Sequence, residues 1–185
     1  YKTLVTAGCA SDVARIITRL TTFRHALPQG APTSTMMANL VFLPTAARLN
    51  GLARTSGGNY SGFVDDLTLS GKKSMRALEP QVRRIVSQAG LRLHPPNSPK
   101  IQHQEAHGEQ VTTGVRVNTV RDIPTEKLRA FNADLRDLKG TGLTQEDRQK
   151  IVVRVKGLIS YGNHLNKNRG RQMRRRLREV CKPSS

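Results

Sequence analysis

The chain has 185 residues, enough for one full hydrophobic core or two small ones, so we expect one domain with an appended module. Lys and Arg total 31 against 13 Asp and Glu, and the net charge of +18 indicates a polyanionic partner rather than a need for solubility. The sequence argues against a membrane partner, because it has no long apolar span and no Trp to anchor a basic amphipathic helix.

The two cysteines, Cys9 and Cys181, lie at opposite ends of the chain and form neither a CxxC pair nor a disulfide framework. We therefore expect two free thiols and a reducing, cytoplasmic location. The chain opens at Tyr1 without an initiator Met or a signal sequence. That start predicts a piece of a longer protein.

Residues 11–20 carry apolar side chains at the i, i+3, i+4 and i+7 spacing of one helical face. This pattern predicts a helix that Ser11 caps. Asp12 stands at the start of the helix, where a carboxylate complements the macrodipole, so we interpret it as part of the helix end rather than as a catalytic acid.

Residues 27–32 read Leu-Pro-Gln-Gly-Ala-Pro, which predicts a turn. Thr33 or Ser34 can then cap a second helix, whose apolar positions extend to Ala47. Pro44 is expected to kink or end this helix, because proline lacks the N–H that a helix interior needs.

Two short apolar runs, residues 60–64 and 67–69, flank the adjacent acids Asp65 and Asp66. This pattern predicts a tight β-hairpin with both acids at its tip. Carboxylates held on a tight turn can bind hard divalent cations, which prefer oxygen ligands.

The spacing of apolar residues predicts a helix over residues 73–89, ended by Gly90. Residues 91–93 and the stretch from Gln110 onward alternate as strands do. We expect the whole run of residues 73–118 to form the second half of a split β-α-β sheet.

From Pro124 onward the apolar pattern is purely helical, and Thr144-x-x-Asp147 predicts a capped helix start. The last segment, residues 166–185, carries eight Lys and Arg against one acid. Its apolar residues have helical spacing and are Met173, Leu177 and Val180. We predict a helix that packs through this stripe and turns its arginines toward phosphates.

In combination, these motifs resemble the active centre of the bacterial, retron-like reverse transcriptases. The Leu27-Pro28-Gln29-Gly30 turn, the Asp65–Asp66 hairpin, the 113–118 segment (Thr-Gly-Val-Arg-Val-Asn) and the basic helical tail follow one another in the order of that family. The resemblance implies an α+β fold, with the second half of a polymerase palm in residues 1–122 and an all-α thumb in residues 123–185. It implies RNA-directed DNA synthesis by two-metal nucleotidyl transfer.

By this resemblance Asp65 is a bridging ligand of two Mg²⁺ ions, and Asp66 supports the ion on the primer side. Two such ions, about 3.5–4 Å apart, stabilise the attacking and leaving oxygens, and Mn²⁺ is an alternative ion. Lys100 ends an Asn-x-x-Lys pattern and is expected near the leaving pyrophosphate, although His94-Pro95-Pro96 forms an apparent insertion before that pattern.

The resemblance also implies contacts to nucleic acid and nucleotides. Residues beside the incoming dNTP and the template base are Pro28, Gln29, Gly30 and Phe63. Residues that grip the primer or recognise RNA are Thr113, Gly114, Arg116 and Asn118. Residues that contact the nucleic-acid backbone are Arg169, Arg171, Arg174, Arg175 and Arg178. The expected partners are a structured RNA template and the RNA–DNA hybrid.

The sequence offers neither the fingers region of the family nor its upstream metal-binding aspartate. We therefore expect a fragment, or one half of a split enzyme, that is inactive until a second segment supplies the fingers and the rest of the palm. Antiphage defence is a role that the family suggests. Two alternatives remain open: a non-catalytic RNA-binding subunit derived from a reverse transcriptase, and a template-independent DNA polymerase in antiphage defence.

Overall fold

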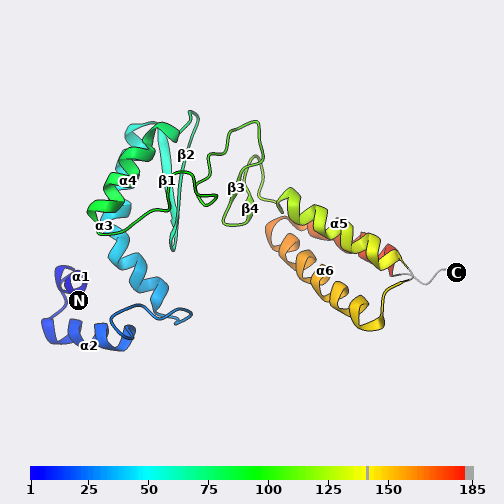
Figure 1. The fold of residues 1–185 in the computed structure, drawn as a ribbon, viewed down its shortest axis with the longest axis horizontal. Coiled ribbons are helices and arrows are strands. Elements are labelled where there is room, and N and C mark those ends of the chain that lie inside the picture. The colour runs from blue at the N-terminus through cyan, green and yellow to red at the C-terminus, as the bar shows by residue number, and fades with distance from the viewer. Residues whose placement is uncertain (141, 182–185) are drawn as a thin grey trace. The chain divides into compact units, whose positions relative to one another are not determined.

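The computed structural model describes residues 1–140 and 142–181, with mixed helices and small sheets as expected for an α+β chain. The chain divides into two compact units, Tyr1–Gln102 and His103–Ser185, and each is described by itself (Figure 1). This division places residues 103–122 with the C-terminal helices, whereas the sequence-based division ended the first part at residue 122. The assignment of palm and thumb stays a prediction.

The first unit is built from helices and one two-stranded sheet. Its elements are α1 (Lys2–Thr6), α2 (Ser11–Thr21), α3 (Ser34–Thr55), β1 (Gly58–Phe63), β2 (Asp66–Gly71), the 3₁₀ turn η1 (Arg76–Leu78) and α4 (Glu79–Gln88). Helix α2 confirms the predicted helix, with Asp12 in its first turn. The predicted cap is wrong, because Ala10 is the N-cap and Ser11 is already helical.

Helix α3 continues through Pro44 to Thr55, so the proline does not end it. The residues after Pro44 include the buried Leu49 and Ala53, and their burial holds the second half of the helix in place. Thr33 is the N-cap residue but makes no side-chain cap bond. The Ser34 hydroxyl instead donates to the Pro28 carbonyl at 2.6 Å and ties the preceding turn to the helix.

Strands β1 and β2 form an antiparallel hairpin in which Phe63 pairs with Asp66. The turn therefore contains only Val64 and Asp65, one residue earlier than predicted, and Asp66 begins the second strand. Val64 has a φ of 55°, a conformation that is uncommon for any residue with a side chain and strained for a β-branched one. A positive φ at the first turn position is what a right-twisted two-residue hairpin requires.

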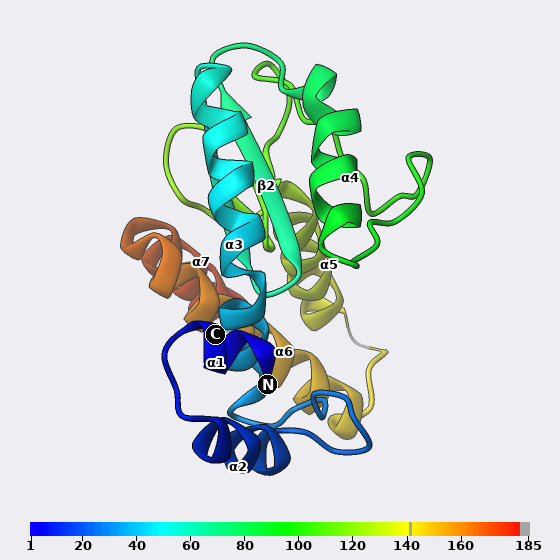
Figure 2. The same ribbon diagram turned by 90° about the vertical axis from the view of Figure 1, so that its left-hand side faces the viewer.

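One face of this hairpin packs on α3 and α4, as Figure 2 shows. Tyr60, Leu67 and Leu69 contact a core that centres on Leu49 of α3 and on α4. The side chains of the opposite face alternate with them along the strands. That face carries Asn59, Ser61 and Phe63 on β1 and Asp66, Thr68 and Ser70 on β2.

The predicted sheet over residues 73–118 does not form within the described residues. The helical part is shorter, η1 and then α4, and residues 91–93 are not a strand. Strands β3 (Val111–Thr112) and β4 (Val115–Arg116) pair only with each other. Residues 91–93 lead into Pro95 and Pro96. Because proline has no N–H to donate to a neighbouring strand, the segment 91–96 does not extend the first sheet.

The second unit contains the β3–β4 hairpin and three mutually packed helices, α5 (Thr125–Lys139), α6 (Gln145–Leu165) and α7 (Lys167–Val180). Its core has Phe131 and Val155 fully buried at the centre. The predicted cap of α6 is confirmed, since the Asp147 N–H donates to the Thr144 hydroxyl at 3.1 Å. Met173 and Leu177 of α7 are buried, which confirms the predicted apolar stripe.

A buried carboxylate joins α7 to the strand segment of this unit. Asp122 is 1% exposed and accepts hydrogen bonds from Arg169 of α7, from Arg116 of β4 and from the Ile123 N–H. Burial alone would raise the pKa of Asp122, but these hydrogen bonds and the charges of the two arginines outweigh it and lower the pKa.

We predict that Asp122→Asn lowers the free energy of unfolding of the chain by about 3 kcal/mol at neutral pH, because two guanidinium groups lose their shared anion. The pKa of Asp122 is lower in the folded chain, so its carboxylate stabilises the fold above the unfolded pKa of about 4 and loses this effect at more acidic pH.

Urea unfolding of both proteins at neutral and at acidic pH measures this effect. The difference between wild type and variant should shrink as the pH falls below about 4. An equal difference at both pH values would contradict the role given to the charge of Asp122.

Candidate functional site

The tip of the β1–β2 hairpin exposes two neighbouring carboxylates that the rest of the described chain leaves unpaired. Asp65 and Asp66 are both exposed, and neither forms an ion pair within residues 1–140 and 142–181. The other adjacent acids of the sequence, Glu146 and Asp147, lie at the start of α6 and contact Lys150. In a chain with a net charge of +18, an unpaired double aspartate is available for a cation.

Asp66 projects from the hairpin face that α3 and α4 leave uncovered. It pairs directly with Phe63, so the two side chains lie on the same face. Phe63 is 66% exposed. An apolar ring beside a carboxylate can contact the sugar or base of a nucleotide whose phosphates bind a metal held by that carboxylate.

The Leu27-Pro28-Gln29-Gly30 turn precedes the first residue of α3. Gly30 adopts a φ of 80°, which glycine reaches without strain, and Gln29 and Gly30 are exposed. The Pro28 carbonyl also accepts from the Ala31 N–H at 3.4 Å, so its position relative to the helix is fixed.

Helix geometry relates this turn to the aspartates within the first unit. α3 has 22 residues and is about 33 Å long, whereas β1 has six residues and is about 20 Å long. β1 runs back along α3 after a two-residue connection, as Figure 1 shows. The hairpin tip therefore lies beside the N-terminal half of α3, on the order of 13 Å short of its start. The turn and the tip therefore lie toward the same end of α3.

Lys100 lies in an irregular segment after α4. It is exposed, and its backbone N–H donates to the Ser98 hydroxyl at 3.3 Å. Within the described part of the chain, no hydrogen bond or ion pair connects it to Asp65 or Asp66. Its role at the pyrophosphate stays a prediction from the resemblance.

The hairpin supplies the type of ligand that a divalent cation prefers, but its two carboxylates are too few to hold the ion by themselves. Mg²⁺ prefers carboxylate oxygens and keeps several waters or substrate phosphates, and Asp65 and Asp66 supply two carboxylates. The described residues contain no cluster of three or more acidic, His or Cys side chains that could hold a metal ion. A further ligand would have to come from substrate, from water or from another segment.

The Thr113–Gly114 turn joins β3 to β4 in the second unit. Both residues have positive φ, 48° and 80°, as a two-residue hairpin turn requires. The Tyr161 hydroxyl of α6 donates to the Gly114 carbonyl at 2.8 Å, and Lys127 lies over the Tyr161 ring. The turn is thus fixed to the helices of its own unit, with Thr113 exposed.

Arg116 and Asn118 use their side chains inside the chain. Arg116 donates to Asp122 at 2.8 Å. The Asn118 amide accepts from the Gln110 N–H and donates to the Gly108 carbonyl. These contacts give both residues a structural role, and contact with RNA stays a prediction.

The five predicted backbone-contacting arginines of α7 differ in their surroundings. Arg169 is held by Asp122, and Arg175 lies 3.5 Å from Glu179. Among the described residues, Arg171, Arg174 and Arg178 form no ion pair, and all three are exposed. Their i, i+3 and i+7 spacing places them on one face of the helix.

Sequence reasoning missed Asp122 and Tyr161, which fix the 111–116 hairpin to the helices. A lone acid between Arg121 and Ile123 in a basic chain was the available signal for Asp122. Both cysteines are free, as predicted. In the part of the chain that the structure describes, no helix is long and apolar enough to cross a bilayer.

The chain is similar in sequence to several reverse transcriptases. It is 33% identical over 150 residues to the retron Mx65 reverse transcriptase of Myxococcus xanthus, a match covering 80% of this chain and 34% of that protein. It is 28% identical over 174 residues to the retron Mx162 reverse transcriptase of the same organism, covering 84% and 35% of the two chains. It is 27% identical over 126 residues to the retron Ec86 reverse transcriptase of Escherichia coli, covering 66% and 38%.

No protein-family model matches the sequence. The chain spans about a third of the length of the curated relatives that it matches. The matches nevertheless cover most of this chain, with several retron enzymes from two organisms. They confirm the resemblance found in the motifs: the chain is a homologue of the retron reverse transcriptases.

Proposed function

We propose that this chain supplies the metal-binding hairpin and an RNA-binding helical unit of an RNA-directed DNA polymerase. The observation that carries the proposal is the pair of unpaired carboxylates, Asp65 and Asp66, at the tip of a two-residue hairpin. The retron relatives support the same reaction class. The remaining metal ligand and the fingers would come from a segment that this chain does not supply.

In this proposal Asp65 and Asp66 hold Mg²⁺, which supplies charge stabilisation for the attacking hydroxyl and the leaving pyrophosphate. The neighbouring residues of this unit then have the following roles. The rigid turn fixes the direction of both carboxylates, because a two-residue connection leaves their backbone few conformations. Phe63 contacts the nucleotide beside them, and Gln29 and Gly30 approach the templating base through an amide and an unhindered backbone.

In this proposal the second unit binds the nucleic acid. It has 18 Lys and Arg against nine Asp and Glu, and α7 alone has seven basic residues against one acid. Arg171, Arg174 and Arg178 project from the exposed face of α7 and are available for phosphates. The Thr113–Gly114 turn is bonded to α6 of the same unit, so it would move together with the helices that bind the strand.

We predict that Asp65→Asn, made in a complete polymerase that contains this chain, reduces primer extension on an RNA template by about a thousandfold or more. The bound metal contributes several kcal/mol to the transition state, and each 1.4 kcal/mol is about tenfold in rate. RNA binding should stay within about twofold, because the exposed Asp65 carries no structural contact.

Asp12→Asn is the matched control, because Asp12 is also exposed and lies in the first turn of α2. It should leave extension unchanged. An equal loss of activity in both variants, or a loss of RNA binding in Asp65→Asn, would contradict the proposal.

We predict that log affinity of the chain for duplex RNA falls with log salt at a slope near −5, as for about six neutralised phosphates. Replacing Arg171, Arg174 and Arg178 together with Gln should make the slope less steep by about 2.7, since each lost phosphate contact contributes about 0.9. Fluorescence anisotropy titrations over a range of salt concentrations measure the slope.

Arg15→Gln serves as a control, because Arg15 is an exposed arginine of α2 in the other unit. Its slope should match that of the unmodified chain. If the triple variant keeps the original slope, Arg171, Arg174 and Arg178 do not contact phosphates.

A non-catalytic RNA-binding subunit is the second candidate function. The observation in its favour is the absence of a third carboxylate near Asp65 and Asp66 among the described residues. Such a subunit would bind RNA with the same salt dependence, but Asp65→Asn would have no effect in any assembly that contains it.

A further inference from the structure

The Lys127 side chain of α5 lies beside the turn that joins β3 to β4. Its ammonium is 4.6 Å from the centre of the Tyr161 ring of α6. A Cβ placed on Gly114 would lie 3.8 Å from the Lys127 Nζ atom and 3.8 Å from the Tyr161 hydroxyl oxygen. A cation and a hydroxyl from two different helices therefore converge on one residue of the turn.

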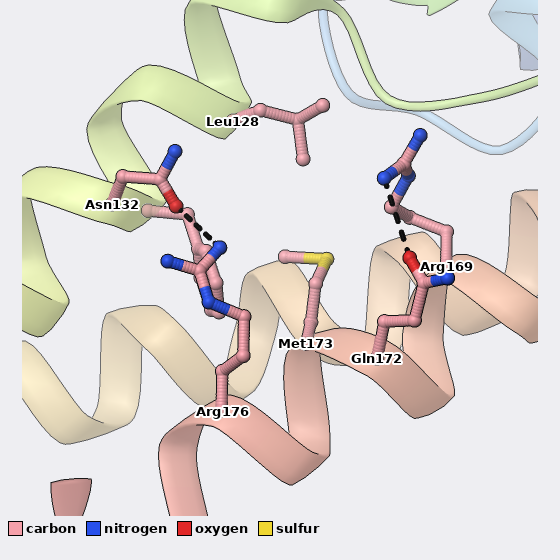
Figure 3. A pocket seen from close by; sticks show the side chains of 7 residues that line it. Leu128, Asn132, Arg169, Gln172, Met173 and Arg176 are labelled. Atoms are coloured by element: carbon pink, nitrogen blue, oxygen red, sulfur yellow. Dashed lines mark hydrogen bonds between the residues drawn. The ribbon is translucent and has the colours of Figure 1, made fainter. Parts of the chain in front are cut away.

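The Lys127 ammonium has no acceptor in the described part of the chain, where it forms neither an ion pair nor a hydrogen bond, and the residue is exposed. The arginines that line the pocket between α5 and α7 differ in this respect (Figure 3). Arg176 donates to the Asn132 oxygen at 2.7 Å, and Arg169 donates to the Gln172 oxygen at 3.4 Å. A cation–π contact uses the charge of an ammonium and no particular N–H, so Lys127 keeps donors for an external acceptor.

The turn adds two main-chain donors. Thr113 and Gly114 are its central residues, because Thr112 pairs with Val115. Among residues 1–140 and 142–181, neither central N–H has a hydrogen-bond acceptor. The Thr113 hydroxyl is already engaged, since it donates to the Thr112 carbonyl at 2.8 Å. The groups left for a ligand are therefore the ammonium and the two main-chain N–H groups, all of them donors.

Two side-chain contacts fix these donors relative to one another. The Tyr161 hydroxyl donates to the Gly114 carbonyl at 2.8 Å, which joins α6 to the turn. The Glu109 carboxylate accepts from the Thr125 N–H at 2.8 Å and from its hydroxyl at 2.7 Å, which joins the segment before β3 to the start of α5. Thr113 has a φ of 48°, an outlier for a β-branched residue. Backbone strain that the surrounding contacts maintain is typical of segments that hold a ligand.

A ligand for this turn must supply acceptor atoms and negative charge. A stacked nucleobase supplies neither in full, and Lys127 already lies over the Tyr161 ring. A phosphate supplies both, because its oxygens accept from an ammonium and from main-chain N–H groups at the same time. The second unit has 18 Lys and Arg against nine Asp and Glu, which favours a polyanion over a single acidic side chain.

We propose that Lys127 and the main-chain N–H groups of Thr113 and Gly114 bind one backbone phosphate of the nucleic acid, and that Tyr161 is the positioning residue that holds the turn. This inference rests on the proposed function, because it assumes that the second unit binds nucleic acid. It adds a phosphate site at the β3–β4 turn to the exposed arginines of α7. A phosphate contact of this kind sets the position of a strand and does not read its sequence.

The test titrates the full chain with a labelled blunt RNA duplex over a range of salt concentrations. Lys127→Gln should lower the affinity about tenfold and make the salt slope less steep by about 0.9, the contribution of one phosphate. Lys127→Arg keeps the charge and should keep the slope. Tyr161→Phe keeps the ring under Lys127 and removes the bond to Gly114, so it should lower the affinity about threefold without changing the slope.

Lys139→Gln is the matched control. Lys139 is an exposed lysine of the same helix, about 18 Å from Lys127 along the helix axis. Its replacement should leave the slope unchanged, and thermal melting checks that each variant is folded. An equal change of slope in Lys139→Gln and Lys127→Gln would assign the effect to net charge and overturn the site.

Amide spectra of the isotope-labelled chain locate the contact. The duplex should shift the N–H signals of Thr113 and Gly114, and Lys127→Gln should remove most of this shift. Inorganic phosphate alone, at the same concentration of phosphate groups, should shift them less. If inorganic phosphate shifts these signals and the duplex does not, the turn binds a free anion and the proposal is wrong.

The remaining outcomes separate this inference from the proposed function. An unchanged slope in Lys127→Gln would overturn the phosphate site, and so would Thr113 and Gly114 signals that the duplex leaves in place. The proposed function stands in that case if duplex binding is salt-dependent and the slope changes when Arg171, Arg174 and Arg178 are replaced together. If the chain binds no duplex at all, both the phosphate site and the proposed RNA binding fail.

Discussion

The two-residue turn between β1 and β2 leaves little freedom in the placement of Asp65 and Asp66. The register pairs Phe63 with Asp66, and one face of the hairpin is held by the core around Leu49. A shift of one residue would move the apolar side chains off that core and turn Asp66 toward it. The same packing that stabilises the unit therefore fixes which side chains the open face presents. The strained φ of Val64 belongs to this constraint, because the turn must reverse within two residues.

The second unit depends on a different constraint: its buried carboxylates must be paired with arginines. Asp122 and Asp134 are its buried carboxylates, and both are bonded to arginines. Each pair joins separate segments: Asp122 connects β4 to α7, and Asp134 of α5 bonds Arg154 of α6. Among the described residues, Arg171, Arg174 and Arg178 of α7 have no acid partner and are exposed. The fold thus uses a few basic residues for cohesion and leaves the rest for a polyanion.

Patterns with a strong local cause predicted the structure well. The helical spacing of 11–20, the Thr144 cap and the stripe of Met173 and Leu177 all appear as expected, because each depends on neighbours close in sequence. The prediction of a sheet over residues 73–118 was wrong, because strand pairing depends on partners far along the chain or outside it. Motif order identified the retron enzymes as relatives, whereas the partners of Asp122 and Tyr161 are set by tertiary packing and could not be named from the sequence.

The central claim, that Asp65 and Asp66 bind a divalent cation, is tested most directly by adding Mn²⁺ to the isotope-labelled chain and recording amide line broadening. The account predicts broadening centred on residues 63–67, and its loss when both aspartates are replaced by Asn. Glu146 and Asp147, the other adjacent acids, are an internal control because they already contact Lys150. Broadening centred on those acids, with residues 63–67 unaffected, would contradict the claim.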